Sequence, residues 1–247
     1  MELLTLEDVR RMSDNGRRGP VVVRAGQALT PGARAWLASH RVEAVYPQGG
    51  GSVGRGDPGA PDRLPQYRTL SGETLTEKPE HMTHLKGNLL VPKDHPRIAF
   101  RGMIDTLEAE TMLVQLASAD YPGLVDELEE VLTFVRRFIR CDVLDEPVGE
   151  IRLCGYTAEE LRQVSHYPDK YLGQPHFLPG RRDGRALLAV NKLRTLARRT
   201  ELAAYAAFRD GAGKLTREDI ILGLNRLSSL LWIMVIKLKA GQYEHTS

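Results

Sequence analysis

The sequence contains, near its C-terminal end, a segment that is apolar on every side of a helix, and this segment limits the folds open to the chain. Thr216 and Asp219 have the spacing of a capping box and predict a helix that runs from there to about Ala240. Residues 230–236 of that helix, LLWIMVI, have no polar face. Because polar residues between 225 and 229 interrupt the wider segment, it is too short and too polar to cross a bilayer. We therefore predict the central helix of a bundle.

The rest of the C-terminal half also has helical periodicity. Helices are predicted over residues 96–118 and 122–140, the second with a regular apolar stripe, and over residues 184–208. Thr157 and Glu160 form a capping box that begins a shorter helix. The sequence therefore predicts a mainly α protein whose larger part is a helix bundle.

The N-terminal part has a different pattern. Residues 1–46 contain two short β-branched runs on either side of a helix that Thr30-Pro31 begins, and they predict a small α/β region without an internal repeat. Residues 47–75 are predicted to be a flexible linker, because Gly and Pro dominate their first part and little apolar surface is available to bury. Residues 76–247 are assigned to the helix-bundle domain.

The helix over residues 184–208 carries charge where it should be at least half buried. Arg194, Arg198 and Glu201 fall on the same stripe as Leu187. A buried charge is costly unless it is paired or meets a charged ligand. Two guanidinium groups suit a polyphosphate, which accepts bidentate hydrogen bonds. The alternative is an ion pair between Arg198 and Glu201, and the residues alone leave both interpretations open.

Two further helices carry polar residues on apolar faces. Asp105 shares a stripe with Met112 and Leu116, and it is expected either to pair with an arginine of the 184–208 helix, within or across subunits, or to be solvated. Asn225 and Ser228 share a face of the apolar helix, where they could bind a ligand or bond a neighbouring helix.

No P-loop and no Gly-x-Gly-x-x-Gly motif is present, so a nucleotide would need another phosphate site. The polar stretch from Lys78 to Lys93 is a candidate, because it supplies Thr83 and His84 together with its lysines. The alternative is an ordinary connecting loop. The seven histidines show no metal-ligand spacing, and no metal site is predicted.

Composition narrows the class of protein further. The 34 basic and 32 acidic side chains nearly cancel, to a net charge of +2, which argues against a nucleic-acid binder. The two cysteines give no disulfide framework, and the charged N-terminus lacks the apolar core of a secretory signal. We therefore expect a cytoplasmic protein that binds neither nucleic acid nor membrane.

Several motifs in one order resemble the cobalamin adenosyltransferases, specifically the ethanolamine-utilisation type, which is related to the propanediol-utilisation type. The resemblance covers about residues 76–240. It is carried by Thr83-His84-Leu85, Lys93-Asp94-His95-Pro96-Arg97, Ile104-Asp105-Thr106-Leu107, His176-Phe177-Leu178-Pro179, the Arg/Glu helix over 194–201 and Leu224-Asn225-Arg226-Leu227-Ser228.

The resemblance implies a five-helix bundle that forms a homotrimer rather than a dimer, with ATP bound between subunits. It implies transfer of the 5′-deoxyadenosyl group of ATP to cob(I)alamin, with Mg²⁺, to form adenosylcobalamin. A flavin-type reductase would supply the reduced corrinoid, and ethanolamine ammonia-lyase would receive the product, in the cytoplasm or within a bacterial microcompartment. The alternative is a delivery or microcompartment interaction protein that has the same fold.

The resemblance also assigns roles to residues. Arg198, Glu201 and Asp105 would be catalytic, with Asp105 paired to an arginine of a neighbouring subunit, and His176 and Phe177 would contact the corrinoid. The aromatic residue that the family places beside the cobalt aligns with His176, so the residue that faces the metal stays open. The residues implied for ATP binding are Thr83, His84, Lys93, Arg194, Arg198, Glu201 and Asn225.

Overall fold

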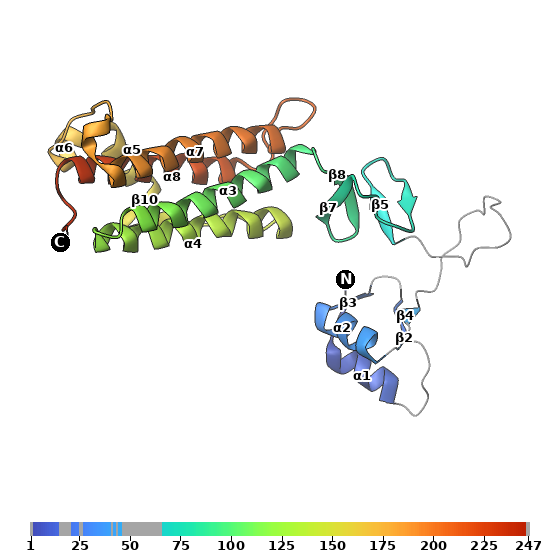
Figure 1. Ribbon diagram of the computed structural model, residues 1–247. Helices are drawn as coiled ribbons and strands as arrows, with labels where there is room; N and C mark the ends of the chain where they lie inside the picture. Colours follow the sequence, from blue (N-terminus) through green and yellow to red (C-terminus); the bar gives the residue numbers. More distant parts are fainter. Residues whose placement is uncertain are drawn as a thin grey trace. The chain divides into compact units, whose positions relative to one another are not determined.

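The computed structural model describes residues 2–14, 21–24, 27–40, 42, 44–45 and 66–245. It divides the chain into two compact units, Met1–Pro61 and Asp62–Ser247, which are described separately here (Figure 1).

The N-terminal unit has the order strand, helix, strand, repeated twice. The first strands of the two halves pair in parallel, with Leu4 opposite Leu29, and the second strands pair in parallel, with Val21 opposite Ala44. The sequence pattern predicts the second helix but neither the first helix nor the structural repeat, because the halves share little sequence beyond a Leu-Thr pair. The elements are β1 (Glu2–Leu4), α1 (Leu6–Asp14), β2 (Val21–Val22), β3 (Gln27–Leu29), α2 (Pro31–Ser39) and β4 (Ala44–Val45).

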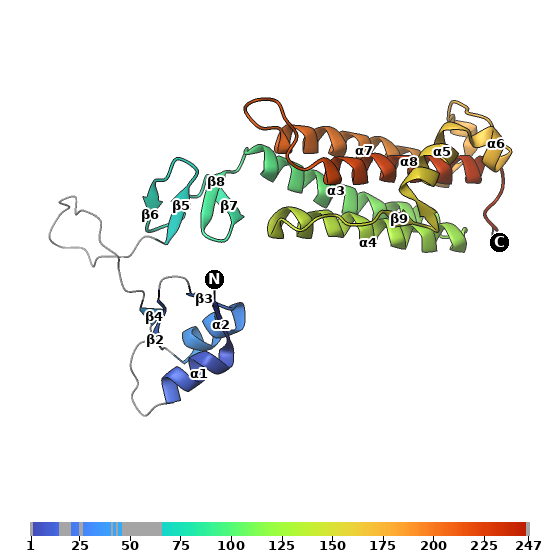
Figure 2. The same ribbon diagram turned by 180° about the vertical axis from the view of Figure 1, so that it is seen from behind.

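The second unit is a helix bundle, as the sequence predicted. Its long helices lie side by side, and α7 and α8 run next to each other in both views (Figures 1 and 2). The bundle helices are α3 (Pro96–Ala117), α4 (Pro122–Leu144), α5 (Ala158–His166), α7 (Arg185–Phe208) and α8 (Glu218–Lys239), with the short α6 (Pro168–Leu172), the 3₁₀ turn η1 (Arg181–Asp183) and the two-stranded hairpin β9 (Arg152–Leu153) and β10 (Tyr156–Thr157) between them.

Helix α8 supplies much of the core, as the sequence predicted for its apolar segment. By length and composition it could cross a membrane, but 72% of its most apolar window is buried inside this unit, as in the core helix of a bundle. A Cβ atom at Gly223 would lie 2.8 Å from the ring of Phe138 on α4. Glycine at this position therefore lets α8 and α4 approach closely.

A four-stranded sheet precedes the bundle, in the order β6-β5-β8-β7. The linker predicted over residues 47–75 is therefore too long, because residues 67–75 form the first two strands, and the part over 47–65 lies outside the described residues. The stretch from Lys78 to Lys93 is likewise a hairpin and not a loop, since its second strand buries Leu90 and Val91 completely. The strands are β5 (Tyr67–Thr69), β6 (Thr74–Leu75), β7 (Met82–Lys86) and β8 (Leu89–Pro92).

Of the two predicted capping boxes, one forms. The side chain of Thr157 accepts from the N–H of Glu160, and the carboxylate of Glu160 bonds back to Thr157. The box predicted at Thr216 is wrong, because its hydroxyl donates to the carbonyl of Phe208 at 2.9 Å and closes the turn between α7 and α8. Asp219 instead accepts from Arg217 and from the N–H of Val148. Tertiary hydrogen bonds thus replace the local cap.

Candidate functional site

A chain of hydrogen bonds joins α7 to α8 at the predicted site. The Nδ2 of Asn225 donates to the carboxylate of Glu201 at 3.1 Å, and the Nη1 of Arg226 donates to the Oδ1 of Asn225 at 2.8 Å. A carboxylate only accepts and a guanidinium only donates, so these two partners fix which way the Asn225 amide faces. The predicted residues Glu201 and Asn225 therefore lie together in one subunit.

Arg194 and Arg198 of α7 have no carboxylate partner in residues 66–245. The guanidinium of Arg194 lies over the ring of Trp232 at 5.0 Å, and its Nε donates to Asn191 at 3.1 Å. Burial lowers the pKa of Arg194, and the nearby charge of Arg198 lowers it further. Arg198 itself is exposed, and the ion pair with Glu201 that the sequence left open is not among the ion pairs of this unit. This pair of cations is arranged to receive an anion.

The loop that carries His176 and Phe177 lies against α8 beside these arginines. The ring of His176 stacks on Trp232 with an interplanar angle of 14°, and the ring of Phe177 with an angle of 24°. Leu178 is 94% exposed and points away from the bundle. Trp232 therefore connects the loop predicted to contact the corrinoid with Arg194.

Sequence reasoning missed the roles of Trp232 and Arg226. Trp232 lies within the segment 230–236, which was assigned wholly to the core. The available signal was the indole N–H, which needs a hydrogen-bond partner when it is buried, and which here reaches His176. Arg226 follows Asn225 directly, and nothing in the apolar pattern distinguishes it.

The residues predicted to bind phosphates lie elsewhere. Thr83 and His84 are on β7, and Lys93 follows β8 and pairs with Glu80 at 3.0 Å. In both views the sheet adjoins one end of the bundle, whereas α6, which precedes the His176 loop, lies at the other end (Figures 1 and 2). Thr83 and His84 therefore lie at the end of the bundle opposite the His176 loop (Figures 1 and 2).

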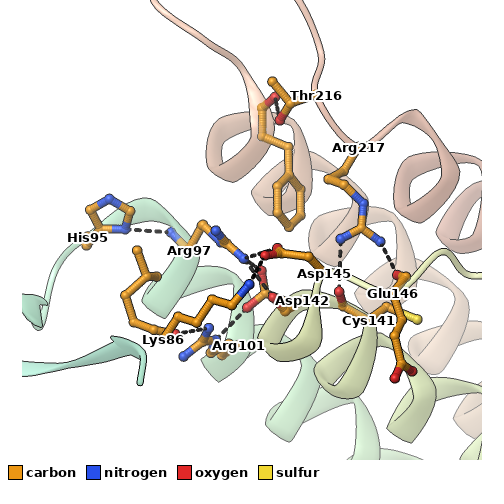
Figure 3. Close-up of polar contacts among 12 residues, drawn as sticks. Lys86, His95, Arg97, Arg101, Cys141, Asp142, Asp145, Glu146, Thr216 and Arg217 are labelled. Carbon is orange, nitrogen blue, oxygen red and sulfur yellow. Dashed lines mark hydrogen bonds and ion pairs between the residues drawn. The ribbon is translucent and has the colours of Figure 1, made fainter. Parts of the chain in front are cut away.

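Strand β7 is held in place by a buried charge cluster, which Figure 3 shows. Asp142 on α4 is fully buried and accepts from the Nε atoms of Arg97 at 2.8 Å and of Arg101 at 2.6 Å. Arg101 also donates to the carbonyls of His84 at 3.2 Å and of Leu85 at 2.7 Å. Arg97, Arg101 and Asp142, here called the Asp142 cluster, therefore fix the strand that carries Thr83 and His84.

Asp105 lies on the exposed side of α3. Its predicted pairing with an arginine of the same subunit is not formed among the ion pairs of residues 66–245. Met112 and Leu116, on the same helix, are 40% and 75% exposed and line an apolar hollow together with Val125. The single chain therefore leaves this stripe exposed, which is the solvated alternative that the sequence left open for Asp105.

Metal-ligating side chains are not clustered in the part of the chain that the structure describes. No group of three or more His, Cys, Asp or Glu side chains there could hold an ion. Of the two cysteines, Cys141 is buried, and burial raises the pKa of its thiol.

Comparison with known proteins identifies the family. The family model of the cobalamin adenosyltransferases matches residues 74–238. The corrinoid adenosyltransferase EutT of Salmonella typhimurium is 32% identical over 228 residues, which cover 86% of this chain and 83% of that protein. EutT of Escherichia coli K12 is 34% identical over 169 residues, which cover 68% of this chain and 62% of that protein.

Similar solved structures include two variants of a PduO-type ATP:corrinoid adenosyltransferase from Lactobacillus reuteri. One, complexed with cobalamin and ATP, is 22% identical with a TM-score of 0.49 and covers 68% of this chain and 91% of that chain. The other, complexed with ATP, is 20% identical with the same TM-score and covers 68% and 94% of the two chains. With two thirds of its length matched by the family model, and with EutT at 32% identity, this chain belongs to the cobalamin adenosyltransferase family.

Proposed function

We propose that the protein transfers the 5′-deoxyadenosyl group of ATP to the cobalt of cob(I)alamin and forms adenosylcobalamin, in ethanolamine catabolism. The observation that carries the proposal is the pair Arg194 and Arg198, two cations without a carboxylate partner in residues 66–245, next to the Glu201–Asn225 pair. Family membership and the EutT relatives support the same activity.

The arrangement suits ATP in two respects. The guanidinium groups of Arg194 and Arg198 match the polyphosphate, which accepts but does not donate hydrogen bonds. Glu201 uses one oxygen for Asn225 and can accept from the donors of ATP, which are its ribose hydroxyls and its adenine amino group. We therefore expect the phosphates toward the arginines and the nucleoside toward Glu201 and Asn225.

The separation of the sheet from the His176 loop favours an ATP site between subunits. Thr83, His84 and Lys93 of one subunit would meet Arg194 and Arg198 of a neighbour. The open stripe on α3 supplies an apolar surface for that contact, and Asp105 would pair there with an arginine of the neighbour. A homotrimer fulfils this arrangement.

The proposed reaction needs little proton transfer by side chains. A bond forms between cobalt and the ribose C5′, the bond between C5′ and the phosphate oxygen breaks, and its electron pair leaves with the polyphosphate. The enzyme must hold both reactants in line and stabilise charge on the leaving group. Arg194 and Arg198 supply that charge stabilisation, and His176 and Phe177 border the corrinoid.

Mg²⁺ fits this site as the counter-ion of ATP. Because residues 66–245 offer no cluster of three metal-ligating side chains, the phosphate oxygens would hold most of the ion's coordination shell.

A flavin-type reductase would supply the reduced corrinoid, and ethanolamine ammonia-lyase would take the product. The N-terminal unit would then serve for docking in the cytoplasm or within a microcompartment, and deletion of residues 1–60 should leave catalysis intact.

The test is an anaerobic absorbance assay with chemically reduced cobalamin, ATP and Mg²⁺. The wild type should consume cob(I)alamin and form a light-sensitive alkylcobalamin, and Arg198→Ala should not. Arg152→Ala, which removes an exposed arginine of the β9 hairpin, is the matched control and should act like the wild type. Tight adenosylcobalamin binding without turnover would favour the delivery alternative, and neither turnover nor corrinoid binding would overturn the proposal.

A further inference from the structure

Trp232 contacts both parts of the proposed site at once. Its indole face lies under the guanidinium of Arg194 at 5.0 Å, and its Nε1 donates to the Nδ1 of His176 at 3.1 Å. One side chain of α8 therefore touches an arginine of α7 and the loop over residues 173–180, here called the corrinoid loop.

The partners of His176 assign a donor and an acceptor role to its two ring nitrogens. The indole nitrogen can only donate, so the Nδ1 of His176 must be unprotonated. The Nε2 lies 3.2 Å from the carbonyl of His166, which can only accept, so Nε2 carries the proton. Both ring nitrogens of His176 thus have partners within the chain, so the ring supports the indole and offers no free nitrogen to the cobalt.

Arg194 depends on Trp232 more than an ordinary surface arginine would. It is half-buried, it has no carboxylate partner in residues 66–245, and the like charge of Arg198 is nearby. The face of an indole attracts a cation, and more strongly when water is excluded. Trp232 therefore holds the guanidinium in place where no acid does.

We propose that Trp232 is a positioning residue that couples the corrinoid loop to the ATP site. The bond to His176 sets the position of the indole, and the indole sets the position of Arg194. This inference rests on the proposed function and adds a residue to it. It follows that a polyphosphate that draws Arg194 toward itself changes the environment of the indole, and that a change in the corrinoid loop alters ATP affinity before any corrinoid binds.

The first test uses Trp232 as its own probe. The chain contains two tryptophans, so Trp36→Phe leaves Trp232 as the single tryptophan, whose emission is excited selectively over that of tyrosine. ATP with Mg²⁺ is titrated without corrinoid, and binding is measured in parallel by equilibrium dialysis. We expect a saturable change in emission that Arg194→Gln abolishes. If dialysis detects ATP binding and the emission stays constant, the coupling is wrong and the proposed function stands; if dialysis detects no binding, both fail.

The second test is a double-mutant cycle on ATP affinity without corrinoid. His176→Phe keeps a ring but removes the acceptor, and Trp232→Phe keeps a ring but removes the donor. Each should weaken ATP binding several-fold, and the double variant should be no weaker than Trp232→Phe alone. Tyr171→Ala, which removes an exposed ring of α6, is the control and should bind ATP as the wild type does. Additive effects, or no effect of His176→Phe, would overturn the proposal. Thermal unfolding of each variant checks its fold, and weaker ATP binding that appears only together with a lower melting temperature would also count against the proposal.

Discussion

Two of the arginine pairs in the bundle have the same four-residue spacing but opposite surroundings. Arg97 and Arg101 lie four residues apart on α3, and Arg194 and Arg198 lie four residues apart on α7. The first pair encloses the buried carboxylate of Asp142, and Arg101 also binds two backbone carbonyls. In the second pair, Arg194 has an indole and an asparagine as its partners. Spacing alone therefore does not separate a structural pair from the pair proposed to bind a ligand, whereas the presence of an acid does.

The two arginine pairs differ in the hydrogen-bond partners of the nearby acidic residues. Asp142 comes from α4 and is fully buried, so it has no alternative to the arginines. Glu201 lies on the same stripe as Arg194, but it accepts from Asn225. The α3 pair thus has its hydrogen-bonding capacity filled by the protein, and the α7 pair has capacity left for a ligand. The predictions below test whether this division into stability and function holds.

The largest effect should come from removing the acid of the structural pair. Asp142→Ala leaves two buried guanidinium groups without their carboxylate, and we expect the free energy of unfolding to fall by about 3–5 kcal/mol. Urea unfolding followed by circular dichroism measures it. Glu150→Ala, which removes an exposed acid 3.8 Å from Arg152, is the control and should change the free energy by less than about 1 kcal/mol. A small effect at Asp142 would contradict the structural role of the cluster.

Removing an arginine of the α7 pair should lower the reaction rate but leave the free energy of unfolding almost unchanged. Arg198→Ala should lower kcat by about 10²–10³-fold, as the loss of one preorganised donor to a developing charge does in other enzymes. Because Arg198 is exposed, the free energy of unfolding should stay within about 0.5 kcal/mol of the wild type. Stopped-flow absorbance and urea unfolding measure the two quantities. A destabilisation as large as that of Asp142→Ala would erase the distinction between the pairs.

ATP should stabilise the protein through one pair and not the other. At an ATP concentration of 100 times Kd, a ligand that binds only the folded state stabilises it by about 2.7 kcal/mol. We expect this gain for the wild type and its loss in Arg194→Gln, measured by thermal unfolding with and without ATP and Mg²⁺. Arg136→Ala, an exposed arginine of α4 paired with Glu108, should keep the gain. An undiminished gain in Arg194→Gln would place the phosphates elsewhere.

The sequence was most informative where a helix has a periodic pattern. The apolar centre of α8 and the stripe of α7 predicted the bundle and the Arg194–Glu201 face, because burial on a helix repeats every three to four residues. The capping box at Thr157 is also a local signal, because its two residues lie three positions apart in the sequence.

What the sequence did not predict depends on partners far apart in the chain. Asp142 lies 45 residues from Arg97, and no local pattern indicates that they meet. The sheet was missed because prolines interrupt its alternation and its strands are short. Trp232 was assigned to the core because its apolar neighbours outweighed its one donor. Asp105 forms no ion pair within residues 66–245, and the arginine proposed as its partner would belong to a neighbouring subunit, which no pattern within one chain indicates.

The smallest effect should be on stability at acid pH. It should come from another arginine that is paired with an acid, Arg217. Arg217, like Arg97, lies over the ring of Phe208, and it binds Asp219 at 2.9 Å. Burial raises the pKa of Asp219, but the hydrogen bonds from Arg217 and from the N–H of Val148 outweigh it, so the pKa is lowered overall.

A carboxyl group whose pKa is lowered in the folded state contributes stability above its unfolded value of about 3.9 and loses it as the pH falls through the lower folded value. Wild-type stability should therefore decline below about pH 4, and Asp219→Asn should decline less steeply there. Urea unfolding at a series of pH values from neutral to acid measures the slopes. Equal slopes would mean that this ion pair adds nothing, and that the Asp142 cluster alone defines the structural side of the comparison.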